Sequence, residues 1–464
     1  MVFSSIEFLL CFLPVFLLLY SITPKQFKNV TLLSGSLVFY ALGEWKFLPL
    51  LLVSVVGNFL LAQRFIRVSG RNGKNGKQKR LKITKKNKML MSAAVVGNIG
   101  VLVLFKVSSG GEGLPLGISF YTFQVLSYLF DVCRGEQKKE TSFVRFATYI
   151  CMFPQLISGP IVAYGEVRDE LRRREFTAQG LQQGLKVFIV GLAAKVLLAD
   201  RIGILWHDVQ VTGFESISTP LAWLAAVAYS LKIYFDFYGY SLMAVGLGRM
   251  LGFELPDNFR DPYMAGSLRD FYRRWHVTLG RWFCKYVYIP LGGSRRGVLR
   301  TVCNLFAVWF LTSIWHGSTV NFLIWGVLIF LLIVMERQFE YLGFARFFRR
   351  GILKVIPHIY LWFTVPVTWM CFAITDMSQL RMYLGRMFGV AEGIYVSAGD
   401  WTRALETYGY LFVIGILACT LFFKRLFYRW KDRFLGKLLL AVLFWFCIWR
   451  LQIQGQNPFM YSSF

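Results

Sequence analysis

The chain has 464 residues, of which 56% are hydrophobic, and its formal net charge is +27. A soluble globular domain is roughly 45–50% apolar on a similar count, so the composition excludes an ordinary soluble enzyme and predicts a single membrane-embedded domain over 1–464. A basic chain can bind nucleic acid, but here the positive charge lies in loops between apolar segments. That placement indicates contact with the lipid bilayer and no nucleic-acid partner.

Apolar stretches recur along the chain, each about long enough to cross a hydrocarbon core of roughly 30 Å. They predict an all-α, polytopic membrane protein with about 10–13 transmembrane helices. The expected stretches are 7–22, 29–43, 46–66, 89–107, 114–132, 143–163, 180–199, 220–251, 300–316, 318–335, 354–375, 408–423 and 437–453.

The loop at 71–88 holds nine Lys and Arg residues in eighteen positions and no acidic residue. Basic loops beside membrane helices usually stay on the cytoplasmic side, next to anionic lipid, so we expect a cytoplasmic loop and an N-terminus outside. The same charge could instead attract an anionic cytoplasmic donor, such as a coenzyme phosphate or an acidic carrier protein.

Two apolar stretches contain residues that interrupt a simple spanning helix. In 143–163, Pro154 and Gly159-Pro160 predict a broken or re-entrant helix. In 220–251, Lys232 and Asp236 are four residues apart, which predicts a buried ion pair or a carboxylate that orients a histidine or a substrate hydroxyl. Asp236 and the nearby Tyr238 are therefore candidate substrate-binding residues.

The segment 267–290 is too rich in charge to cross lipid, and its aromatic residues recur at spacings of three and four. We expect one amphipathic helix at the membrane interface, with His276 at the edge of the aromatic stripe. Its histidine is either incidental or faces a reaction chamber while the arginines meet anionic donor groups. The candidate donor-binding residues here are Arg273, Arg274 and Trp275.

His316 closes an apolar run that ends in Trp315-His316-Gly317, and the chain has only four histidines. A titratable ring in a membrane segment is costly and usually functional, although an interfacial histidine at a helix end is the simpler alternative. A neutral imidazole suits a general base, because its ordinary pKa of about 6.5 lies near working pH. Gly317 removes bulk beside the ring and is expected to let a substrate approach; Trp315 is a candidate substrate-binding residue.

The C-terminal tail at 454–464 ends in Met460-Tyr461-Ser462-Ser463-Phe464. It is either an aromatic anchor at the interface or a tether for the Tyr461 hydroxyl, which can accept and release an acyl group. The eight cysteines show no CxxC pair and no metal spacing, so no metal site and no bound cofactor are expected.

Taken together and in order, seven motifs resemble the membrane-bound O-acyltransferase family, and most closely its bacterial branch of alginate and cell-wall polysaccharide O-acetylases. The resemblance runs from about residue 3 to 330 and returns in the tail, where Met460 and Ser462 depart from the branch pattern. The motifs are Gly117–Phe123, Phe153–Pro160, Tyr234–Tyr240, Gly246–Arg249, Phe271–His276, Tyr288–Gly293 and Trp315–Gly317.

The resemblance implies a ring of tilted helices around a thin central pore, with re-entrant or amphipathic helices on the cytoplasmic side of a bacterial plasma membrane. It implies that His316 is the catalytic base, that His276 is the second functional histidine, and that Tyr461 is a candidate acyl relay. It also implies a cytoplasmic acyl-thioester donor, an extracytoplasmic transferase partner and a polysaccharide acceptor.

Three functions are compatible with these expectations. The first is O-acetylation of a cell-wall polysaccharide or exopolysaccharide, with acetyl-coenzyme A as donor. The second is D-alanylation of teichoic acid from a carrier-protein thioester. The third is a polysaccharide exporter or a scaffold without catalysis.

Overall fold

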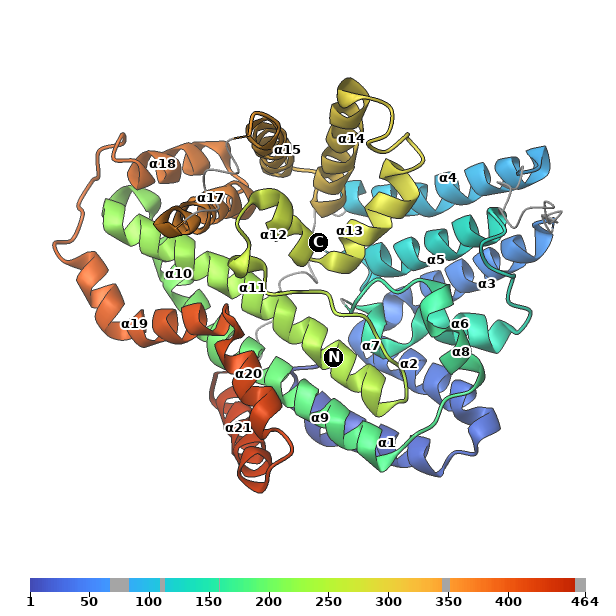
Figure 1. The fold of residues 1–464 in the computed structure, drawn as a ribbon. Coiled ribbons are helices and arrows are strands. Elements are labelled where there is room, and N and C mark those ends of the chain that lie inside the picture. The colour runs from blue at the N-terminus through green and yellow to red at the C-terminus, as the bar shows by residue number, and fades with distance from the viewer. Residues whose placement is uncertain (67–82, 109–112, 158, 344–350, 455–464) are drawn as a thin grey trace. The chain divides into compact units, whose positions relative to one another are not determined.

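The computed structural model describes residues 1–66, 83–108, 113–157, 159–343 and 351–454, and all regular secondary structure within these ranges is helical. Figure 1 labels the helices along the chain, which divides into two compact units. Within the described residues, the first combines Met1–Phe188 with Met243–Pro256, and the second combines Ile189–Leu242 with residues 257–454. Helices α9 and α11 each contribute to both units.

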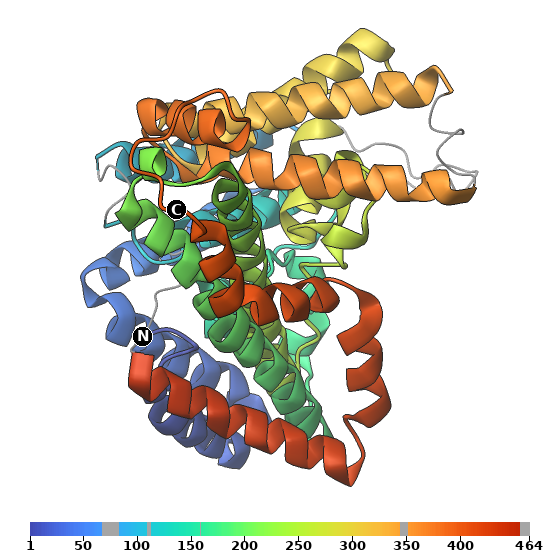
Figure 2. The same ribbon diagram turned by 90° about the vertical axis from the view of Figure 1, so that its left-hand side faces the viewer.

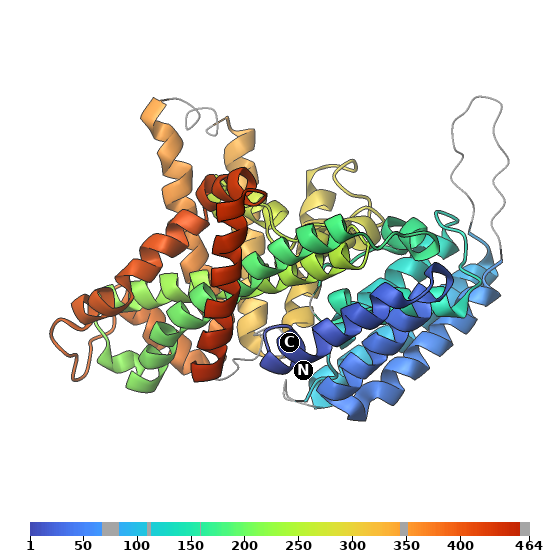
Figure 3. The same ribbon diagram turned by 90° about the horizontal axis from the view of Figure 1, so that it is seen from below.

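The first unit is a set of packed helices whose N-terminal members, α1 to α3, lie side by side (Figure 3). Its core is rich in phenylalanine: Phe8, Phe39 and Phe153 pack ring against ring with centroids 5.5 to 6.3 Å apart. Its helices are α1 (Leu13–Ile22), α2 (Lys28–Glu44), α3 (Leu48–Arg64), α4 (Lys85–Ser108), α5 (Ile118–Cys133), α6 (Phe143–Cys151), α7 (Phe153–Leu156), α8 (Tyr164–Arg172) and the start of α9 (Ala178–Ala193).

The predicted interruption of the segment at 143–163 is confirmed. Helix α6 ends at Cys151, Met152 is extended, and α7 restarts at Phe153 with Pro154 in its first turn. Proline favours that position because its missing N–H would have no helical partner there. The Ser36 hydroxyl on α2 accepts the N–H of Phe153 at 3.1 Å and so holds the break in place.

A buried carboxylate, Glu140, links the connection after α5 to α6 and α8. It accepts hydrogen bonds from the Arg145 guanidinium at 2.7 Å, the Tyr164 hydroxyl at 2.5 Å and the backbone N–H of Ser142 at 2.9 Å. Burial alone would raise its pKa, but these bonds together lower the pKa of Glu140 to about 2. The side chain is 1% exposed, so this charge belongs to the interior of the unit.

In the second unit, the long helices α14 and α17 both pack against α15 (Figure 2). Helices α19 and α20 meet at a bend of 73° and lead into α21. The helices of this unit are α10 (Asp200–Thr212), α11 (Thr219–Met250), α12 (Leu268–Arg274), α13 (Val277–Phe283), α14 (Val298–His316), α15 (Val320–Tyr341), α17 (Ile356–Ala373), α18 (Met377–Met387), α19 (Asp400–Ala418), α20 (Leu421–Trp430) and α21 (Phe434–Gln454).

Six helical stretches among the described residues are long and apolar enough to cross a membrane, or seven if the bent pair is one span. The expected count of 10–13 stays a prediction, because other expected stretches form shorter apolar helices, such as Glu7–Ile22 and Ile118–Cys133, and α11 carries Lys232 and Asp236 in its middle. The ring of helices around a pore stays a prediction. The six are Lys25–Arg64, Lys85–Val107, Val298–His316, Val320–Tyr341, Leu353–Ala373 and Phe434–Ile453.

Candidate active site

His276 lies at a break between two short helices, not on one amphipathic helix as the spacing of the aromatic residues predicted. Helix α12 ends at Arg274 and α13 begins at Val277, while His276 adopts a left-handed backbone with φ 45° and ψ 52°. A non-glycine residue in this region costs about 1–3 kcal/mol and persists only where its surroundings enforce it. The surrounding contacts therefore hold the imidazole at this break, and its position does not follow from helical periodicity.

Helix α12 is fixed at its start by two polar caps. The Ser267 hydroxyl accepts the N–H of Asp270 at 3.1 Å. The Glu336 carboxylate on α15 accepts the N–H groups of Leu268 at 2.5 Å and Arg269 at 3.0 Å. Because a helix N-terminus carries partial positive charge, these oxygens stabilise it and anchor the segment before His276 to α15.

The Asn258 side chain holds the other side of the break. Its Oδ1 lies 3.0 Å from His276 Nδ1 and accepts the Thr278 hydroxyl at 2.9 Å. His276 is 4% exposed, and burial lowers its pKa to about 3. The imidazole is therefore neutral across the physiological pH range.

His316, the last residue of α14, is 6% exposed and lies among aromatic rings. We call these rings the aromatic box. Trp325 and Phe372 meet the imidazole edge-on, with centroids 5.2 and 5.1 Å away. The Asn321 amide donates to the Phe372 carbonyl at 2.9 Å and so ties the start of α15 to the end of α17 beside the histidine. The box consists of Trp315, Phe322, Trp325 and Phe372.

Trp315 connects the two histidines. Its ring centroid lies 4.6 Å from that of His316 and 6.1 Å from that of His276. On α11, Phe237 meets His276 edge-on at 4.7 Å. Two buried imidazoles thus share one indole neighbour in a site lined by aromatic rings. Electrostatic interactions in such a buried site are stronger than in water. An imidazole is also the side chain that most often transfers protons in enzymes.

A second route of ring contacts links the same segments. Trp275 packs against Trp369 on α17 at 5.0 Å, and Trp369 stacks on Trp325 of the aromatic box at 6.2 Å. The predicted donor-binding residue Trp275 is therefore buried as a packing element beside His276.

The sequence suggested that Gly317 leaves open space for a substrate beside His316. In the structure, a side chain already fills this space. A Cβ at this position would overlap the Phe322 ring, which already fills the volume beside the glycine. Phe322 in turn stacks on His316, with centroids 6.3 Å apart and planes 21° from parallel. The glycine is required so that this ring can pack against the end of α14.

The Gly317→Ala variant should lower the rate of a reaction that depends on His316 by roughly ten- to a hundredfold, because the added methyl group displaces Phe322 and shifts His316. Initial rates of the expected thioester consumption measure the effect. The matched control is Gly97→Ala, since a Cβ at Gly97 on α4 meets no atom within 4 Å. Equal rates for wild type and both variants would show that Phe322 does not position His316.

Asp236 has a partner that sequence spacing did not suggest. Its carboxylate lies 3.0 Å from Lys195 Nζ, and the same ammonium group contacts Asp200 at 2.5 Å. Lys195 is in the short π-helix Ala194–Ala199 that follows α9. The structure thus places Asp236 in a buried ion cluster, while its expected role toward a substrate stays a prediction.

The remaining predicted site residues are dispersed. Arg274 forms an ion pair with Asp270 at 2.9 Å, and Arg273 is exposed. Tyr238 stacks on Tyr234 with centroids 5.3 Å apart. Tyr461 and most of the basic loop at 71–88 lie outside the described residues.

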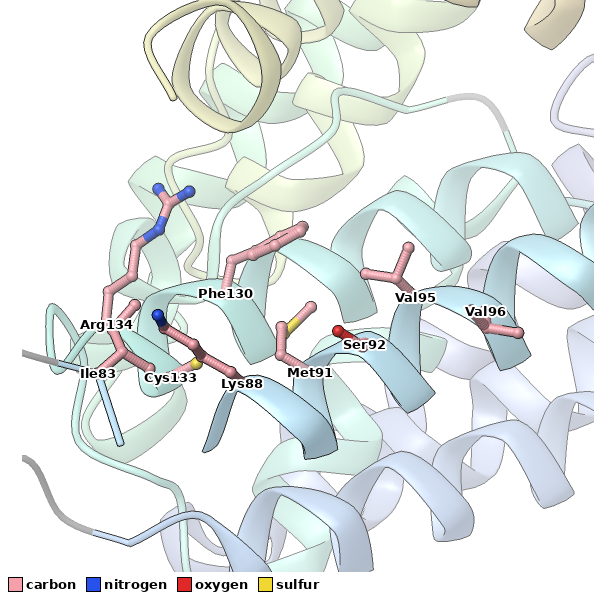
Figure 4. Close-up of a pocket in the computed structure, with 9 residues that line it drawn as sticks. All are labelled: Ile83, Lys88, Met91, Ser92, Val95, Val96, Phe130, Cys133 and Arg134. Carbon is pink, nitrogen blue, oxygen red and sulfur yellow. The ribbon is translucent and has the colours of Figure 1, made fainter. Parts of the chain in front are cut away.

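One open groove in the first unit has a volume of about 480 Å³ and lies between α4 and α5 (Figure 4). Lys88 and Arg134 lie at one end, and Met91, Val95 and Phe130 supply apolar lining. No histidine lines it, so neither candidate catalytic histidine belongs to this groove. Among the described residues, no cluster of His, Cys, Asp or Glu has the geometry to hold a metal ion.

Comparison with known proteins identifies the family of the chain. The model of the membrane-bound O-acyltransferase family matches residues 37–383, which include both histidines and Asn258. The chain belongs to this family. It is an O-acyltransferase and a multi-pass membrane protein.

This O-acyltransferase is similar to several bacterial acyltransferases, over its full length in one case and over part of it in others. It is 31% identical over 502 residues to the probable alginate O-acetylase of Pseudomonas putida, with 100% of both chains covered. It is 29% identical over 438 residues to the peptidoglycan O-acetyltransferase of Helicobacter pylori, covering 84% of this chain and 80% of that protein. It is 28% identical over 236 residues to the teichoic acid D-alanyltransferase of Bacillus subtilis, covering 48% and 59%.

Sequence reasoning missed Asn258 and the ring partners Trp369 and Phe372 of this O-acyltransferase. Asn258 lies in an irregular segment between α11 and α12, where no periodic pattern marks a side chain as buried. Trp369 and Phe372 look like ordinary apolar residues of a spanning helix. Only the packing of α17 against α15 brings them to the histidines.

Proposed function

We propose that this protein transfers an acetyl group from cytoplasmic acetyl-coenzyme A for O-acetylation of a polysaccharide outside a bacterial plasma membrane. The observation that carries the proposal is the contact of one indole, Trp315, with two buried imidazoles in an O-acyltransferase. Full-length similarity to a probable alginate O-acetylase, and similarity over 84% of this chain to a peptidoglycan O-acetyltransferase, support an acetyl group and a polysaccharide acceptor.

In the proposed reaction, an acceptor hydroxyl attacks the carbonyl carbon of the thioester. His316 takes the hydroxyl proton as the C–O bond forms, and the C–S bond then breaks to release the thiolate. The proton on His316 passes to that thiolate, which leaves as coenzyme A thiol and restores the neutral imidazole. General-base catalysis of this kind contributes about 10²–10⁴ in rate.

Two further elements of the proposal concern delivery. The basic loop at 71–88 attracts the phosphates of the donor. The Tyr461 hydroxyl, or a hydroxyl of an extracytoplasmic transferase partner, carries the acetyl group onward to the polymer.

The second candidate function is D-alanyl transfer to teichoic acid from a carrier-protein thioester. Similarity to the Bacillus subtilis teichoic acid D-alanyltransferase favours it, over about half of this chain. The chemistry at His316 would be the same, because both donors are thioesters. The exporter or scaffold alternative has no support from the comparisons, since the matching family consists of acyltransferases.

The test uses the full-length protein in liposomes with acetyl-coenzyme A labelled in its acetyl group. We expect time-dependent loss of the thioester, with label appearing on the protein or on added polysaccharide. Label on the protein that disappears in Tyr461→Phe would identify the tail as the relay. Turnover of a D-alanyl carrier protein, with none of acetyl-coenzyme A, would overturn the acetyl assignment in favour of D-alanylation.

A further inference from the structure

Asn258 provides a polar side chain within hydrogen-bond distance of the His276 ring. Its side chain is 2% exposed, and its Oδ1 faces three groups: the backbone N–H of Thr278 at 3.3 Å, the Thr278 hydroxyl at 2.9 Å and His276 Nδ1 at 3.0 Å. One oxygen thus collects the polar groups on both sides of the break between α12 and α13.

The backbone N–H of Thr278 determines which atom of the amide lies there. A backbone N–H can only donate, so the atom that faces it must be the Asn258 oxygen and not the amide nitrogen. That oxygen can only accept, so His276 Nδ1 must carry a hydrogen to bond with it. A neutral imidazole has a single N–H, which leaves the lone pair on Nε2.

The backbone at Asn258 reinforces this arrangement. Its carbonyl accepts the N–H of Val277 at 2.9 Å, and the Arg274 carbonyl accepts the N–H of Arg260 at 2.9 Å. These two bonds join the segment around Asn258 to the end of α12 and the start of α13, on either side of the left-handed His276. Asn258 therefore holds both the ring and the unusual backbone that carries it.

We propose that Asn258 is a positioning residue that fixes His276 as a hydrogen-bond acceptor through Nε2, so that His276 accepts a polar hydrogen of the bound substrates and does not stabilise the oxyanion. The tautomer itself follows from the geometry alone. The role toward the substrates rests on the proposed acyl transfer, and it divides the work between the histidines: His276 accepts a hydrogen other than the reacting one and so orients the substrates, and His316 removes the proton of the attacking hydroxyl.

The tautomer can be measured without any activity. The chain has four histidines, so ¹⁵N-histidine labelling gives few signals, and a His276→Gln variant assigns the relevant pair. We expect Nδ1 to be protonated and Nε2 unprotonated in the wild type. Thr278→Val removes one donor to the Asn258 oxygen and should leave that pattern unchanged. A protonated Nε2 in the wild type would overturn the proposal, whatever the activity.

The role of His276 is tested with Asn258→Asp, which keeps the shape and the accepting oxygen but adds a negative charge. A carboxylate beside Nδ1 raises the pKa of His276 and, below that pKa, places a proton on Nε2. We expect transfer by this variant to fall about tenfold for each pH unit below the new pKa and to recover above it. If His276 instead stabilised the oxyanion, the variant would be most active at low pH, and the assignment of His276 as a hydrogen-bond acceptor toward the substrates would be wrong.

Discussion

Replacing His316 with alanine is expected to lower acyl transfer by about 10²–10⁴-fold, the usual contribution of a general base. The aromatic box encloses this imidazole with Trp325 and Phe372, which places it in a buried position suited to a neutral base. The measurement is the initial rate of thioester loss by full-length protein in liposomes, compared at equal amounts of folded protein.

The matched control for this prediction is His207→Ala, because His207 is exposed on α10. It should retain wild-type transfer, so that any loss in His316→Ala reports on the site and not on histidine content. Size-exclusion profiles and helical circular dichroism establish that both variants are folded. Wild-type rates in folded His316→Ala would contradict the assignment of the base.

Replacing Glu140 with alanine is expected to destabilise the first unit by several kcal/mol. The substitution removes the acceptor for the Tyr164 hydroxyl and the partner of the Arg145 guanidinium. Loss of one member of a buried pair costs about 3–5 kcal/mol, and partial exposure of Arg145 places this case at the lower end. The free energy of unfolding in detergent, from denaturant titration, measures the effect.

Glu140 also predicts a specific dependence of stability on pH. Its pKa of about 2 lies below the ordinary value of 4.5, so the unfolded chain binds the proton more readily than the folded one. The ionised Glu140 carboxylate therefore stabilises the folded state by about 3 kcal/mol. This stabilisation is fully present above about pH 4.5 and is lost as the pH falls toward 2.

The conservative variant Glu140→Gln separates this charge effect from side-chain size. Its stability should lie below that of the wild type at pH 6, and the difference should shrink as pH is lowered toward 3. The matched control is the same substitution at the exposed Glu136, whose carboxylate lies 3.9 Å from the Arg134 guanidinium at the surface. A constant difference between Glu140→Gln and the wild type across this pH range would show that the Glu140 charge does not stabilise the fold.

The sequence was sufficient for the properties that depend on local composition. The length of the apolar stretches predicted the candidate spanning helices α14, α15, α17 and α21. Pro154 predicted the break before α7. The resemblance of ordered motifs gave the family, which the comparison confirms. These features are encoded over a few neighbouring residues, so periodicity and composition are enough to find them.

The sequence was not sufficient where distant segments determine local conformation. The 3,4-spacing of aromatic residues around His276 predicted a continuous helix, yet contacts from Asn258, eighteen positions earlier, enforce a left-handed break. Similarly, the i, i+4 spacing suggested Lys232 as the partner of Asp236, whereas the π-helix after α9 delivers Lys195. Helical periodicity carries no information about such tertiary contacts.

The interlocked rings around the two imidazoles restrict how this enzyme can diverge. Trp325, Trp369 and Phe372 each contact rings from another helix, so a change in the size of one leaves a void or an overlap at its neighbour. Such positions can change only in compensating pairs, while exposed loop residues can change one at a time. Over evolutionary time, we expect acceptor preference to drift through the loops, and the histidine surroundings to change rarely and in correlated steps.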